Sequence, residues 1–167
     1  DTTMVNSIDK GFFDKLYRLS VQMARQPVSK NKAVWCYTAA FLADLEAKPQ
    51  EAWRHIQMAT KCPTSEYMKE SINVLKMYLD AKVSVYDSAY ESRLFNDLKW
   101  LDAKIQSELT EDLRNNISEY YYYYLRSNIS FYYWNDMLRR ILLAEVCPRM
   151  LDKGMETRAL QLANMAD

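Results

Sequence analysis

The amino-acid sequence predicts an all-α fold, and three observations support this. The chain has 167 residues but only 2 glycines and 4 prolines, so long segments are free of helix breakers. Apolar residues recur at three- and four-residue steps along most of its length, and no stretch shows convincing strand alternation. We expect about eight helices joined by short loops and stacked as antiparallel hairpins in a single domain, residues 1–167.

In the first half of the chain, the predicted helix ends coincide with prolines and capping residues. Pro27 ends the first helix, and Pro49 lies at the start of the third, where its missing N–H costs little. Pro63 ends that helix, and Thr64 or Ser65 can cap the fourth. The predicted ranges are Ile8–Arg25, Asn31–Ala47, Gln50–Lys61 and a fourth helix whose apolar stripe runs from Tyr67 to Leu79.

Four further helices are predicted in the second half. The fifth begins near Asp87 or Ser88, with one long bent helix through this point as an alternative. Thr110-Glu111-Asp112 is typical of a helix start and predicts a sixth helix to about Leu125. The seventh begins near Ser130 and ends near Pro148, or bends there and continues to Lys153, and the last is Met155–Ala166.

Small residues occupy positions where neighbouring helices must approach closely. Ala52-x3-Ile56-x2-Ala59 followed by Pro63 resembles the second half of a tetratricopeptide repeat. In the preceding helix the family's Trp, Leu, Gly and Tyr correspond to Cys36, Ala39, Ala40 and Ala43. A second copy of the spacing occurs at Ala159, Ala163 and Ala166, although Pro148 falls inside what should be its first helix.

This resemblance implies a right-handed array of helical hairpins with a groove for an extended peptide. The residues that it places in the groove are Tyr37, Phe41 and Asp44. Ordinary packing between helices is the alternative role for these three side chains. An apolar stripe on the terminal helix would allow further repeats or self-association.

Little in the sequence indicates catalysis, a cofactor or a metal. Its 22 basic and 22 acidic residues balance, so nucleic acid is not an expected partner, and no apolar run is long enough to insert into a membrane. His55 is the only histidine, and we expect a structural role for it. Cys36, Cys62 and Cys147 form no C-x-x-C motif, so free buried thiols are expected, with one disulfide as the alternative.

The most unusual stretch runs from Tyr120 to Tyr124. On a helix, Tyr122 and Tyr123 point away from the predicted buried face, so they either pack against another hairpin or form an aromatic surface. The leading hypothesis is a non-enzymatic scaffold that binds a protein or peptide. The alternatives are a carbohydrate-binding module of an exported protein, using these tyrosines and Trp134, and, third, an enzyme with a pocket between helices.

Two N-glycosylation sequons begin at Asn116 and Asn128, and their use depends on a compartment that the sequence does not define. The chain starts at Asp1 rather than at a methionine. We therefore expect a processed chain or a module of a larger protein.

Overall fold

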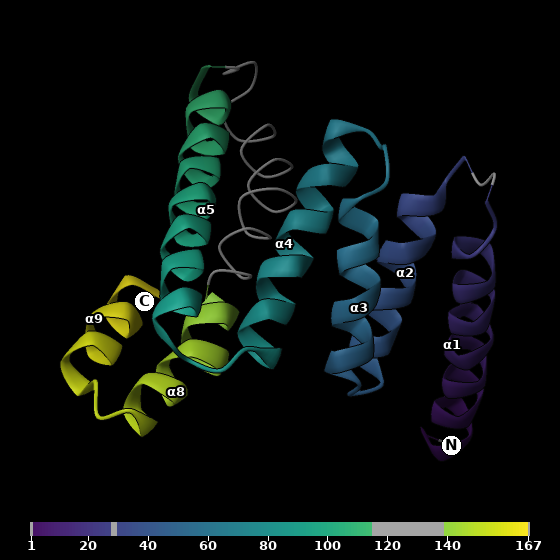
Figure 1. Cartoon of the computed structure of the whole chain (residues 1–167), viewed down its shortest axis with the longest axis horizontal. Coiled ribbons are helices and arrows are strands. Elements are labelled where there is room, and N and C mark those ends of the chain that lie inside the picture. The colour runs from purple at the N-terminus through teal and green to yellow at the C-terminus, as the bar shows by residue number, and fades with distance from the viewer. Residues whose placement is uncertain (1, 28–29, 115–138, 167) are drawn as a thin grey trace. The chain divides into compact units, whose positions relative to one another are not determined.

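A computed structural model of the chain describes residues 2–27, 30–114 and 139–166. All regular elements in these residues are helical, which confirms the predicted all-α class (Figure 1). The chain divides into two compact units, Asp1–Val83 and Ser84–Asp167. Two units can belong to one domain, so the single-domain organisation stays a prediction.

The first unit contains four helices, and the first of them begins at Thr2, before the predicted start at Ile8, while the other helix ends lie close to the predicted ones. Pro49 occupies the first turn of its helix, and the Ser65 hydroxyl accepts a 3.2 Å hydrogen bond from the Met68 N–H. In the turn between the second and third helices, Ala47 adopts a positive φ of 58°, and the Lys48 N–H donates to the Ala43 carbonyl. The helices are α1 (Thr2–Ala24), α2 (Lys32–Leu45), α3 (Pro49–Thr60) and α4 (Glu66–Val83).

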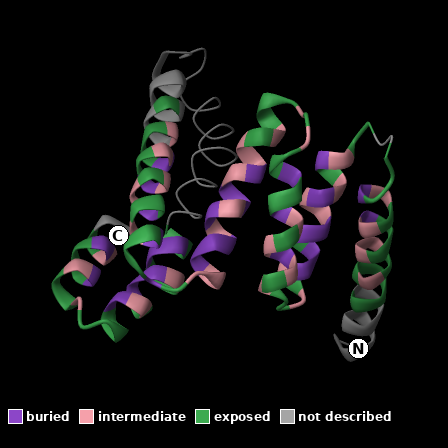
Figure 2. Cartoon of the chain, in the orientation of Figure 1, coloured by how far each residue is buried: buried purple, intermediate pink, exposed green. Residues whose placement is uncertain are grey.

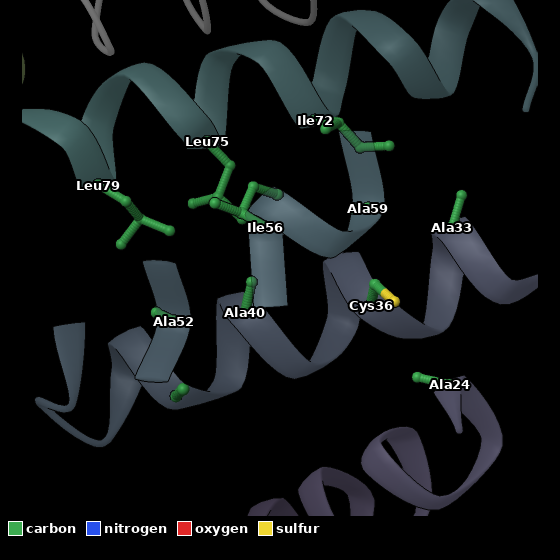
Figure 3. Packing of buried hydrophobic residues seen from close by; sticks show 11 residues of the cluster. Ala24, Ala33, Cys36, Ala40, Ala52, Ile56, Ala59, Ile72, Leu75 and Leu79 are labelled. Atoms are coloured by element: carbon green, nitrogen blue, oxygen red, sulfur yellow. The ribbon is translucent and has the colours of Figure 1, made fainter. Parts of the chain in front are cut away.

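Alanines form the contact between α2 and α3. Ala40 of α2 and Ala52 of α3 are completely buried, and Ile56 of α3 lies between α2 and α4 (Figure 3). Figure 2 shows buried residues along the facing sides of α2, α3 and α4. Because alanine projects only a methyl group, it lets the backbones of adjoining helices approach closely. Ile72, Leu75 and Leu79 complete this core from α4.

The second unit contains α5 (Ser88–Arg114), the π-helix η2 (Arg140–Val146), α8 (Cys147–Asp152) and α9 (Glu156–Ala166). The Tyr90 N–H donates to Oδ1 of Asp87 at 2.8 Å, so Asp87 caps the start of α5. This confirms the break near Asp87 and excludes the alternative of one long bent helix.

Two boundaries in the second unit differ from the prediction or settle an alternative. The predicted helix start at Thr110-Glu111-Asp112 is wrong, because α5 continues through it to Arg114. No glycine or proline interrupts α5, and these polar residues are tolerated in a helix interior.

Pro148 lies in the first turn of α8, directly after the π-helical turn, so helical structure continues past this proline. Proline lacks an N–H and clashes with the carbonyl four residues earlier, which favours a local change of helical geometry.

Candidate functional site

An apolar stripe on α2 is left uncovered. Val34, Phe41 and Leu45 retain 41%, 45% and 57% of their exposure, although the opposite side of the same helix is buried. Their spacing of seven and four residues places them on one face. This face presents large apolar groups that the unit itself does not cover.

The structure separates the three predicted groove residues. Phe41 belongs to the exposed stripe, whereas Tyr37 is half-buried and packs against the core of the first unit. Asp44 is also half-buried, and its Oδ1 accepts a 2.7 Å hydrogen bond from Nζ of Lys82 in α4. Tyr37 and Asp44 therefore lie at the border of the stripe, and Phe41 is the most accessible of the three.

The Asp44–Lys82 ion pair connects α2 to α4. Burial lowers the pKa of Lys82, but the hydrogen bonds to Asp44 and Tyr78 outweigh it and raise the pKa overall. The ammonium also lies 4.3 Å from the centroid of the Tyr78 ring. Asp44 thus has a structural partner within the unit, which sequence spacing did not indicate.

The apolar face of α2 continues onto α1. A groove of about 790 Å³ between the two helices is lined by Phe13 of α1 and Leu45 of α2. Phe12 is 60% exposed, and its ring lies 5.7 Å from that of Phe13 in an edge-to-face arrangement. We use the name α2 apolar face for the surface formed by Val34, Phe41 and Leu45 of α2 together with Phe13 of α1. Sequence reasoning found only Phe41, because helical periodicity does not tell which apolar residues a neighbour covers.

A second hollow opens between α1, α2 and α3 and has a volume of about 1050 Å³. His55 is one of the residues that line it. The Tyr17 hydroxyl donates to Oε2 of Glu51 at 3.1 Å and lies 3.1 Å from Nε2 of His55. Since that hydroxyl has one hydrogen, its oxygen is left to accept from the His55 N–H. Half-buried His55 thus connects α3 to α1, in line with the structural role expected for it.

Burial lowers the pKa of His55, and the positive charges of Arg54 and Arg25 lower it further against the opposing effect of Glu51. A lowered pKa in the folded state means that the unfolded chain binds the proton more readily. The His55 contribution to stability is therefore fully present above about pH 6.5, the unfolded value, and is lost as pH falls through the folded pKa.

We expect the urea midpoint of the wild type to fall more steeply between pH 7.5 and 5 than that of His55→Gln. Comparing the two curves isolates this histidine from the carboxylates, which titrate in both proteins. Parallel curves would show that His55 has the same pKa in the folded and unfolded states.

The cysteines are free, in agreement with the expectation. Cys36 and Cys147 are buried, and Cys62 is partly exposed. Burial, followed by the neighbouring Cys62, raises the pKa of Cys36 to about 11. The Cys36 thiol is therefore protonated at neutral pH and a poor nucleophile. Among the described residues, no three His, Cys, Asp or Glu side chains are grouped as metal ligands.

The predicted aromatic surface residues Tyr122 and Tyr123 lie outside the described residues, as do Trp134, Asn116 and Asn128. In the described ranges, none of the helices combines the length and apolar character that crossing a bilayer requires. No family model, curated protein or solved structure matches the chain.

Proposed function

We propose that this chain is a non-enzymatic scaffold that binds a protein or peptide segment over the α2 apolar face. The exposure of Val34, Phe41 and Leu45 on one side of a helix otherwise packed into the core carries the proposal. Contiguous large apolar groups on a protein surface mark interaction sites more often than isolated ones do.

The surroundings of this face favour an amphipathic segment as the partner. Phe13 and Leu45 line the groove between α1 and α2 and provide a concave apolar contact. Lys10, Asp14 and Lys48 line the same groove and provide charges of both signs at its edge. An apolar centre with a polar edge is the usual composition of a protein interface.

The contacts within the first unit also support an array resembling tetratricopeptide repeats. Each of the four helices packs against the next, and α2 additionally contacts α4. In such arrays the first helix of each hairpin lines the binding surface, a position that α2 occupies here if α3 is its partner.

Capture experiments with a matched pair of variants test the scaffold. Phe41→Ser/Leu45→Ser should lose a partner that the wild type retains from an extract of the source cells. Apolar side chains at the centre of an interface contribute most of the binding energy, so the loss should be about tenfold or more in affinity.

The control is Tyr67→Ser/Leu160→Ser, which removes two apolar side chains that are 79% and 64% exposed but lie on α4 and α9. This variant should keep the partner. Equal binding by wild type and both variants would place the interface elsewhere, and a dimer that only Phe41→Ser/Leu45→Ser dissociates would identify a second copy of the chain as the occupant.

A further inference from the structure

We propose that the hollow between α1, α2 and α3 binds a small, multiply charged anion of the phosphate class. This inference does not depend on the α2 apolar face, since none of the four residues that define that face lines the hollow, and only Lys48 lines both the hollow and the groove between α1 and α2. It is carried by an accumulation of basic side chains around one concave site in a chain whose formal charge is zero.

The lining of this hollow is strongly basic. Among the described residues that line it, Glu51 carries the one carboxylate, which already accepts a hydrogen bond from Tyr17. The basic lining residues are Arg18, Arg25, Lys32, Lys48 and Arg54. A charge excess of one sign around a concave surface raises the local concentration of the opposite ion.

Most of these charges have no partner within the described residues. Lys48 lies 3.7 Å from a carboxylate oxygen of Glu46, which is the one ion pair in the set. The side chains of Arg18, Arg25, Lys32 and Arg54 form neither a hydrogen bond nor an ion pair with another described residue. Within the described part of the chain, four of the five basic side chains that line the hollow thus have no acidic partner.

The charges act on the inside of the hollow and come from all three helices. Arg25, which directly follows α1, and Arg54 of α3 both lower the pKa of His55, and Arg54 also lowers that of Tyr17 against the larger effect of burial. Lys32 of α2 acts in the same direction on the buried Cys36 thiol. The positive charges of Arg25, Lys32 and Arg54 thus act on side chains that line the same hollow.

The chemistry and size of the site select the ligand class. A guanidinium group binds two oxygens of a phosphate at once, and three arginines line this site. A monocarboxylate would neutralise only one of the available charges, whereas linked phosphates match several. The volume of about 1050 Å³ is at the upper end for small-molecule sites, so the ligand need not be a macromolecule.

Calorimetric titration with inorganic pyrophosphate at constant ionic strength tests the site. We expect saturable binding by the wild type with one site per chain. Arg25→Gln/Arg54→Gln should weaken this binding by about tenfold or more, because each charge-assisted hydrogen bond to phosphate is strong. Both arginines are exposed, and their side chains form no ion pair with another residue that the structure describes, so the variant should keep its far-UV circular dichroism.

Lys61→Gln/Lys76→Gln is the matched control, because it removes two positive charges from the same unit outside the hollow. It should bind pyrophosphate as the wild type does. Equal losses of affinity in the two variants would show that pyrophosphate is attracted by the overall positive charge and not bound in the hollow, which would contradict the proposal. The absence of saturable binding by the wild type would also overturn it. Neither result bears on the capture experiment at the α2 apolar face.

Discussion

Replacing Ile56 with alanine is expected to lower the free energy of unfolding of the unit Asp1–Val83 by about 2–5 kcal/mol. The Ile56 side chain is completely buried and lies between Ala40 of α2 and Leu75 of α4 (Figure 3). The alanines around it on α2 cannot extend into the space that a smaller side chain would leave. A cavity therefore persists, and the lost contacts add to the lost burial.

Urea unfolding followed by tryptophan fluorescence measures this change, because Trp35 and Trp53 pack against the same core. Met58→Ala in the same helix is the control, since Met58 is 48% exposed. Its effect should stay within about 0.5 kcal/mol. Similar losses in the two variants would mean that the position of Ile56 between the helices does not determine its contribution.

The sequence predicted most helix ends between the end of α1 and the start of α5, because their signals are local. Ser65 and Asp87 cap the next helix through hydrogen bonds that span three residues. Pro49 restricts the backbone at the start of α3. The small residues of α2 and α3 allow these two helices to approach closely. Features of this kind can be recognised without knowing the fold.

The start predicted at Thr110 failed because a capping sequence permits a helix start without requiring one. Nothing in α5 forces the preceding helix to stop, so the chain continues to Arg114. At Pro148 the sequence left open whether the helix ends or bends and continues, because neighbouring packing determines how a helix accommodates a proline.

The candidate sites depend on residues that are far apart in the sequence. Asp44 was predicted to face the groove, but its carboxylate accepts a hydrogen bond from Lys82 in another helix. The sequence does not show this pairing, because the two residues are 38 positions apart. Arg18, Lys32 and Arg54 come from three helices and form no motif along the chain. Only the packing of α1 against α2 and α3 brings their charges to one hollow.

Ala40→Leu is expected to destabilise the same unit by about 1–3 kcal/mol, for the opposite reason to Ile56→Ala. Ala40 is fully buried where α2 meets α3, so a larger side chain must push the helices apart or adopt a strained rotamer. The control is Ala103→Leu, because Ala103 is exposed on α5. Denaturant midpoints and slopes of the two variants separate overpacking from a change in the unfolded state.

The double variant Ala40→Leu/Ile56→Ala then tests whether these two residues share one space. The added leucine can fill part of the volume that isoleucine leaves, so the combined loss should be smaller than the sum of the single losses by about 0.5–3 kcal/mol. Strict additivity would show that the two side chains do not compensate each other. Partial recovery would establish that residue size at this contact, rather than the identity of either residue, sets the distance between α2 and α3.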